Sequence, residues 1–176
     1  MPQINSSKIY KTLKALGLAA PIALGGAYLT APSEGLVLGT YSDPVGIVTS
    51  CYGRVDKSLK LGTKYTEEEC IQQLGEDLLK ANQQMKAVVK VPLQSDYQEA
   101  ALTDFVYNKG IGNFKSSSIL KELNKKNYDS ACEQLTRWVF ATHNGIKVKL
   151  KGLVVRATKE YEWCVSNPPQ EVKDLK

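Results

Sequence analysis

The sequence predicts an α+β fold, with a small antiparallel sheet followed by a larger helical part. Residues 36–65 are rich in Gly, Val, Thr and Tyr and carry turn signals, a pattern typical of short antiparallel strands. The run from Thr66 to Glu69 has the sequence of a helix start, with Thr as the N-cap and a Glu three residues later. After Pro92 the pattern is mostly helical, so strands and helices are segregated along the chain.

The helix predicted from Thr66 has an apolar face at helical spacing, formed by Cys70, Ile71, Leu74, Leu78 and Met85. Ser95 is expected to cap a helix that runs through Tyr107. Further helices are predicted at 116–123, 128–140 and 152–165. The polar tail, residues 166–176, follows two prolines and is expected to be disordered.

Composition limits the classes of function. The 176 residues suffice for one domain, perhaps in two lobes, and the net charge of +5 is mild. No dense basic block with interleaved aromatic residues occurs, so nucleic acid is not an expected partner. There is one histidine and no Cys-x-x-Cys, so neither a metal site nor a cofactor is predicted.

The cysteines at positions 51, 70, 132 and 164 are even in number, which suggests disulfide bonds in an exported protein. Four cysteines allow three connectivities. We favour Cys51–Cys70 and Cys132–Cys164, because each bond then stays within one lobe. Four buried free thiols are the alternative.

An uncharged segment of 19 residues, Ala15 to Ser33, follows Lys8, Lys11 and Lys14. A basic flank before such a segment predicts an export signal that inserts into the inner membrane through residues 15–33, with the lysines on the cytoplasmic side. Its five large aliphatic residues contribute only about −1.5 to −3 kcal/mol to insertion, so anchorage is expected to be marginal and reversible. A cleaved signal peptide and an ordinary buried helix are the alternatives.

Two carboxylates and a hydroxyl follow this segment: Glu34, Asp43 and Thr49. Hydrolysis of a glycosidic bond needs an acid, a base and a group that holds a water. Glu34 is expected to close the first helix of the domain, and a carboxyl beside an apolar helix end tends to keep its proton. Asp43 is expected in the turn of Ser42-Asp43-Pro44, where it stays ionised. Glu34 is therefore the predicted acid and Asp43 the predicted base, with Thr49 holding the attacking water.

The run from Glu34 to Gly53 resembles the phage-type lysozymes, glycoside hydrolase family 24. The family's Glu, Asp and Thr are separated by the same intervals as Glu34, Asp43 and Thr49. Two later stretches resemble the family in the same order: Phe-x-Tyr-Asn-x-Gly-x-Gly-x-Phe at 105–114 and Gly-Leu-x-x-Arg at 152–156. The resemblance covers about residues 34–165. Arg54 is a departure, because the family often has His there, and it affects expected stability more than mechanism.

The resemblance implies a lysozyme-like fold and an N-acetylmuramidase that cleaves peptidoglycan. It implies that Asn108 and Phe114 line the saccharide cleft between lobes, and that Arg156 orients or pairs with Glu34. Structural roles for these three residues are the alternative. His143, in the sequence Thr142-His143-Asn144-Gly145, is expected in an exposed loop without a catalytic role.

The N-terminus is similar to that of signal-arrest-release endolysins, which the host secretion machinery exports and which later leave the inner membrane for the periplasm. This similarity implies a signal-anchor at 1–33, a catalytic domain at 34–165 and a tail at 166–176, in a monomeric enzyme. With no cysteine before Cys51, we expect activation by refolding rather than thiol exchange. A lytic transglycosylase and a non-enzymatic, membrane-tethered wall-binding protein are the alternative functions.

Overall fold

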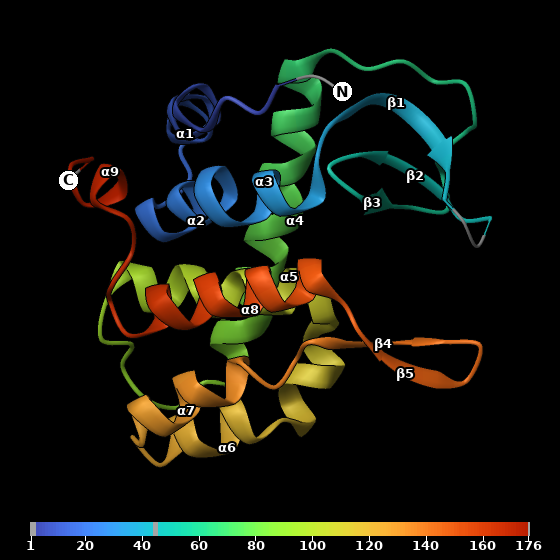
Figure 1. Ribbon diagram of the computed structural model, residues 1–176. Helices are drawn as coiled ribbons and strands as arrows, with labels where there is room; N and C mark the ends of the chain where they lie inside the picture. Colours follow the sequence, from blue (N-terminus) through green and yellow to red (C-terminus); the bar gives the residue numbers. More distant parts are fainter. Residues whose placement is uncertain (1–2, 44–45, 176) are drawn as a thin grey trace. The chain divides into compact units, whose positions relative to one another are not determined.

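The computed structural model describes residues 3–43 and 46–175, except for the side chain of His143. It divides into two compact units, Met1–Leu79 and Lys80–Lys176. The N-terminal unit contains short helices, a three-stranded antiparallel sheet and the first part of a long helix, and the C-terminal unit is mainly helical (Figure 1). The predicted α+β fold is confirmed.

The N-terminal residues form helices. They are α1 (Ser6–Ala15), α2 (Ala20–Gly25), the π-helical η1 (Gly26–Thr30) and α3 (Ala31–Glu34). The Asn5 side chain accepts a hydrogen bond of 2.9 Å from the backbone of Lys8 and so caps α1. Helical backbone is continuous from Ala20 to Glu34. Within the described residues, no helix is both long enough and apolar enough to cross a membrane.

Three of the five large aliphatic side chains of the predicted anchor are buried in the N-terminal unit. Ile22, Leu24 and Leu29 are at most 3% exposed. A Cβ added to Gly26 would lie 2.7 Å from Leu78 Cδ1 and 2.9 Å from a methyl carbon of Leu13. Glycine at this position therefore lets the N-terminal helices pack closely, and the segment supplies part of the core.

The predicted sheet is present, with β1 (Val37–Ser42), β2 (Val48–Cys51) and β3 (Arg54–Val55) in the order β1-β2-β3. All neighbours are antiparallel, and Tyr41 is directly opposite Thr49. The loop that follows is attached to β1, because Thr40 N donates to Thr63 O over 2.9 Å and Thr63 N donates to Thr40 Oγ1 over 3.0 Å.

The long helix α4 (Glu67–Val88) begins with the predicted capping box. Thr66 N donates to Glu69 Oε2 over 2.7 Å, and Glu69 N donates to Thr66 Oγ1 over 3.2 Å. The predicted apolar face is at most 1% exposed. Lys8 of α1 pairs with Glu67 and Glu68 in the first turn, at 2.5 and 2.9 Å.

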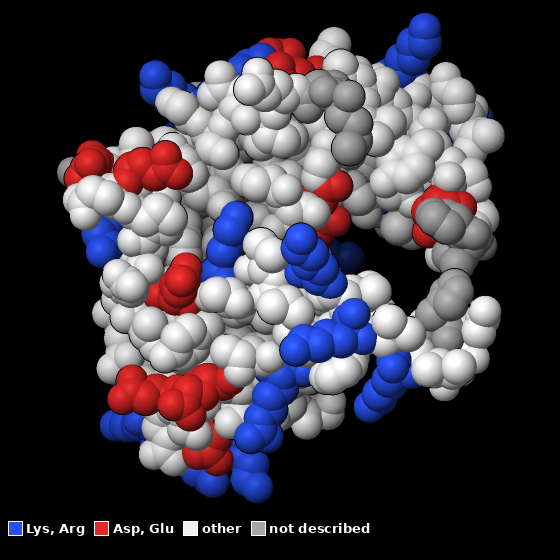
Figure 2. All heavy atoms as spheres, viewed as in Figure 1, with Lys and Arg blue, Asp and Glu red and all other residues white. Residues whose placement is uncertain are grey.

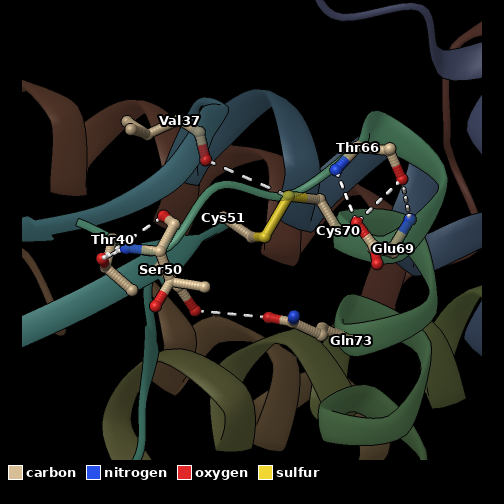
Figure 3. The surroundings of a disulfide bond; sticks show 9 residues. Val37, Thr40, Ser50, Cys51, Thr66, Glu69, Cys70 and Gln73 are labelled. Carbon is tan, nitrogen blue, oxygen red and sulfur yellow. Dashed lines mark hydrogen bonds between the residues drawn. A yellow bond between two sulfur atoms is a disulfide. The ribbon is translucent and has the colours of Figure 1, made fainter. Parts of the chain in front are cut away.

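The favoured disulfide pairing is confirmed. Cys51–Cys70 joins β2 to α4, and Cys132–Cys164 joins two helices of the C-terminal unit. Around the first bond, Ser50 Oγ donates to Gln73 Oε1 of α4 over 3.2 Å (Figure 3). The sheet is therefore attached to α4 by both a covalent bond and a hydrogen bond.

The C-terminal unit is built from α5 (Asp96–Ser116), α6 (Ser118–Asn124), α7 (Tyr128–Leu135), α8 (Lys151–Cys164) and α9 (Gln170–Lys173). The predicted cap is present, since Gln98 N donates to Ser95 Oγ over 3.1 Å. Helix α5 is kinked at Gly110, whose φ of 82° is unfavourable for other residues. Phe105 packs edge-on against Trp138, with ring centroids 5.0 Å apart.

Two predictions for the C-terminal part are wrong. The helix predicted at 128–140 ends at Leu135, and a hairpin of β4 (Phe140–His143) and β5 (Ile146–Lys149) follows. The pair Asn144-Gly145 adopts positive φ at both residues, the conformation that closes a two-residue hairpin. The tail is not devoid of structure, because α9 forms there and Val172 is fully buried.

Candidate active site

Glu34 is the last residue of α3, as the sequence predicted, although α1 and α2 precede it. Gly35 ends the helix with a φ of 75°, a value that glycine adopts without the strain of a Cβ. The Glu34 side chain is half-buried. The helix end therefore fixes the backbone of the predicted acid.

Asp43 follows β1 and stabilises the start of its turn. Its backbone N–H donates to Ile47 O over 2.9 Å, and its Oδ1 accepts from Ile47 N over 2.8 Å. Pro44, predicted in the same turn, lies outside the described residues. A carboxylate that accepts a backbone hydrogen bond is held in orientation, which suits a group that has to aim at a water molecule.

Thr49 lies in β2 and is 5% exposed. Its hydroxyl donates to Ile47 O over 3.3 Å, so the same residue is bonded to both Asp43 and Thr49. Side chains directly opposite one another on antiparallel strands project from one face, so Thr49 and Tyr41 share a face of the sheet.

Gly53, in the turn between β2 and β3, lies against the acid. A Cβ added there would be 3.0 Å from Glu34 Oε2, and the φ of Gly53 is 83°. The preceding Tyr52 is 1% exposed, and burial raises its pKa to about 12, with a smaller contribution from Glu67. The buried Tyr52 thus anchors the turn that brings backbone next to Glu34.

The carboxyls of Glu34 and Asp43 both influence the pKa of the Tyr41 hydroxyl. Burial raises the pKa of Tyr41, and the charges of Glu34 and then Asp43 raise it further. Glu34 from a helix end and Asp43 from a strand turn are thus brought close to Tyr41, which is opposite Thr49. The three residues predicted to carry the chemistry lie in one unit, around this tyrosine.

Arg156, Phe114 and Asn108 lie in the C-terminal unit. Arg156 is 7% exposed and forms a two-bonded ion pair with Asp104 of α5, at 3.0 and 2.8 Å. Phe114 is fully buried and packs against Phe105, whereas Asn108 is half-buried before the kink at Gly110. The predicted contacts of Asn108 and Phe114 with saccharide stay predictions, and so does the predicted pairing of Arg156 with Glu34.

A second carboxyl adjoins this ion pair. Glu160 is 2% exposed, and its Oε1 lies 3.7 Å from Arg156 Nε. Burial raises the pKa of Glu160 well above its usual value, and the Asp104 carboxylate raises it further, whereas Arg156 opposes the rise. Two carboxyls share one guanidinium in a buried place, so Glu160 keeps its proton beside Asp104.

Arg54, the departure from the family pattern, has a structural role. Its Nη1 is 3.0 Å from Glu76 Oε2 and its Nε is 3.8 Å from Asp77 Oδ1, both in α4. It thus ties β3 to α4.

Tyr41 and Gly53 were part of the sequence motif without an assigned role. Strand alternation could have identified Tyr41 from the sequence, because it lies two residues before Asp43 and side chains two residues apart project from the same face.

A carboxyl at a helix end, a carboxylate at a strand turn and a buried hydroxyl in the next strand are the kinds of group that hydrolysis of a glycosidic bond needs. Among the described residues, no cluster of His, Cys, Asp and Glu is arranged to hold a metal ion. The small sheet and the helices define a lysozyme-like glycoside hydrolase.

The chain belongs to the phage lysozyme family, whose model matches residues 31–160. It is therefore a muramidase, with peptidoglycan as substrate. The SAR-endolysin of Bacteriophage PS119 is 37% identical over 149 residues, covering 82% of this chain and 86% of that protein. The SAR-endolysin of Escherichia phage Mu is 35% identical over 167 residues, covering 90% and 93%.

Solved structures agree. The endolysin from Escherichia coli O157:H7 phage FAHEc1 has a TM-score of 0.76 and 30% sequence identity, over 84% of this chain and 94% of that one. The fold class predicted from the motifs is thus confirmed.

Proposed function

We propose that this protein is an endolysin that hydrolyses the β-1,4 bond between N-acetylmuramic acid and N-acetylglucosamine with inversion at the anomeric carbon, and so lyses a bacterial host. Glu34 is the general acid, Asp43 the general base, and Thr49 holds the attacking water. The supporting observation is that Ile47 bonds to both Asp43 and Thr49, while Gly53, in the turn after the same strand, lies against Glu34 Oε2.

The two carboxyls have distinct surroundings. Glu34 ends an apolar helix and faces the backbone of Gly53, whereas Asp43 accepts a hydrogen bond from the backbone of Ile47. Glu34 is accordingly the group that protonates the leaving oxygen. Asp43 removes a proton from water on the other side of the sugar, and this water attacks the anomeric carbon.

The substrate is anionic, and the C-terminal unit has a surface suited to it. Residues 134–159 contain no acidic residue, and the lysines of β5, Lys147 and Lys149, are exposed. Basic side chains gather on the face of this unit seen in Figure 2. A positive surface concentrates a polyanion such as peptidoglycan, whose stem peptides carry carboxylates. The supported partner is therefore the peptidoglycan wall.

Residues 15–33 also control the enzyme. The host secretion machinery exports the chain, this segment anchors it in the inner membrane, and release into the periplasm lets it fold as a monomer. The support is that Ile22, Leu24 and Leu29 are buried in the folded unit, so they cannot lie in lipid at the same time. The helix that ends at Glu34 is drawn from this segment, so release completes the site.

The test of the catalytic roles uses Glu34→Gln, Asp43→Asn and Thr49→Ala, with Glu133→Gln as an exposed control. We expect the first two to lose at least about a hundredfold in rate at unchanged thermal stability, because proton transfer contributes about 10²–10⁴. The wild type should release reducing sugar ends of inverted configuration, followed by NMR.

Two outcomes contradict the proposal. Anhydro-muramic ends together with full activity of Asp43→Asn would identify a lytic transglycosylase. Lysis by Glu34→Gln at the rate of the wild type would identify a wall-binding protein without catalysis.

A further inference from the structure

Tyr41 lies on the same face of the sheet as the proposed base and the water-holding threonine. It is directly opposite Thr49, so the two side chains project from one face. The antiparallel pairing continues one step further, because Asp43 N donates to Ile47 O over 2.9 Å. Strand alternation thus extends to Asp43, whose side chain lies on the face of Tyr41.

The opposite face of the sheet contacts α4. Ser50 and Arg54 are partners in the β2–β3 register, and both bond to this helix. Ser50 reaches Gln73 over 3.2 Å, as Figure 3 shows, and Arg54 reaches Glu76 over 3.0 Å. Tyr41 therefore projects from the face that α4 leaves uncovered.

The Tyr41 hydroxyl is a neutral donor on the sheet face that carries Asp43 and Thr49. Burial is the main reason that its pKa is raised, and the charges of Glu34 and Asp43 add to the effect, so it remains protonated at neutral pH. Among the described residues this hydroxyl has no hydrogen-bond partner, and the side chain is half-buried. Its proton is available to a molecule that enters the site.

The position of the scissile bond follows from the two carboxyls. In an inverting glycosidase the acid and the base act on opposite sides of the sugar that is cleaved. A hydroxyl on the sheet face of the base and of the water-holding threonine lies beside that sugar. Hydrogen bonds to the sugar strengthen as charge develops at the anomeric carbon, so a donor here stabilises the transition state more than the bound substrate.

We propose that Tyr41 is a substrate-contacting residue, whose hydroxyl donates a hydrogen bond to the reacting sugar between Glu34 and Asp43. This inference rests on the proposed roles of the two carboxyls. It adds a residue that the acid, base and water-holding set does not include.

The test compares Tyr41→Phe with Tyr65→Phe, which removes the hydroxyl of another half-buried tyrosine of the same unit. Soluble, uncross-linked glycan strands serve as substrate, and kcat and KM are measured across pH, well below the unfolding temperature. For Tyr41→Phe we expect kcat to fall about tenfold or more, as for loss of one transition-state donor. KM and both limbs of the pH profile should stay unchanged, and Tyr65→Phe should match the wild type.

Each contrary result has its own meaning. An unchanged kcat in Tyr41→Phe overturns the contact. A shifted limb of the pH profile with kcat kept at the optimum also overturns it, because Tyr41 would then tune a carboxyl instead. Glu34→Gln is measured in parallel: if that variant is inactive while Tyr41→Phe is fully active, only the inference about Tyr41 fails. Activity of Glu34→Gln would instead remove the proposed function itself.

Discussion

The backbone of Gly53 lies against the carboxyl of Glu34, so that a Cβ at this position would be 3.0 Å from Glu34 Oε2 and 3.7 Å from its Cδ. The two residues come from different elements, a helix end and a strand turn. Their proximity means that the acid is confined by backbone, which cannot move aside as a flexible side chain does. A change at Gly53 therefore reports on the position of the acid.

Gly53→Ala should lower activity about tenfold or more, because the added methyl group displaces the Glu34 carboxyl from its productive position. It should also cost about 1–2 kcal/mol in the free energy of unfolding, since alanine is strained at a φ of 83°. Hydrolysis rates and denaturant unfolding measure the two effects.

Gly62→Ala is the matched control. Gly62 has a φ of 87°, but a Cβ there would meet nothing within 4 Å. It should lose similar stability and keep its activity. Equal activity losses in the two variants would show that backbone strain, and not contact with Glu34, is the cause.

Loss of either disulfide should lower stability, but only loss of Cys51–Cys70 should also lower kcat. In a chain-entropy treatment, closing 19 residues with Cys51–Cys70 contributes about 3 kcal/mol and closing 32 residues with Cys132–Cys164 about 4 kcal/mol. Paired Cys→Ser variants test this by denaturant unfolding. Because Cys51 follows Thr49 by two residues, loss of the first bond should also lower kcat, whereas loss of the second should mainly lower stability. The reverse order of effects on kcat would contradict this assignment.

Glu160 should make stability depend on pH. Its pKa is raised by burial and by Asp104, so the folded state holds the proton more tightly than the unfolded state. Glu160 therefore contributes stability that is fully present below the usual value of 4.5 and is lost as pH rises from there toward the raised pKa. Glu160→Gln keeps a neutral hydrogen-bonding group and should flatten this fall, as thermal unfolding across pH 5 to about pH 8 would show.

Glu162→Gln, on the same helix, should retain the slope of the wild type. An unchanged slope in Glu160→Gln would mean that other groups account for the pH dependence. The comparison separates the buried carboxyl pair from the ordinary charge of the protein.

Release from the membrane should depend on the apolar content of residues 15–33. Ala19→Leu adds an aliphatic side chain at an exposed position, so it should strengthen anchorage and delay lysis while the purified enzyme stays fully active. Gly26→Leu adds similar apolar character where a Cβ would meet Leu78 at 2.7 Å, so it should also destabilise the folded enzyme. Membrane fractionation, lysis timing and the activity of purified protein distinguish these effects. Prompt lysis by Ala19→Leu would contradict control by this segment.

The features predicted well from sequence are local. The capping box of Thr66 and Glu69 and the buried face of α4 depend on residues within a few positions of one another, and so does the helix end at Glu34. The disulfide pairing was open among three connectivities, and the division into lobes favoured the right one.

The features that sequence missed depend on register or on distant partners. The hairpin at Phe140 needs only four residues per strand, too few to outweigh a helical pattern. The ion pair of Arg156 with Asp104, 52 residues earlier in the chain, is one that no local pattern identifies. Tyr41 gains significance only once its register with Thr49 is known.

The ion pairs of Lys8 with Glu67 and Glu68 have a consequence for the timing of lysis. In the anchored orientation proposed above, Lys8, Lys11 and Lys14 start on the cytoplasmic side, but Lys8 ends beside α4 on the periplasmic side. The resting voltage, negative inside, opposes this transfer by about 2.3 kcal/mol per charge for each 100 mV. Three lysines raise the cost to about 7 kcal/mol at that voltage. If the chain is anchored in this orientation, an energised membrane holds the enzyme back, and a collapse of the voltage lets the chain fold.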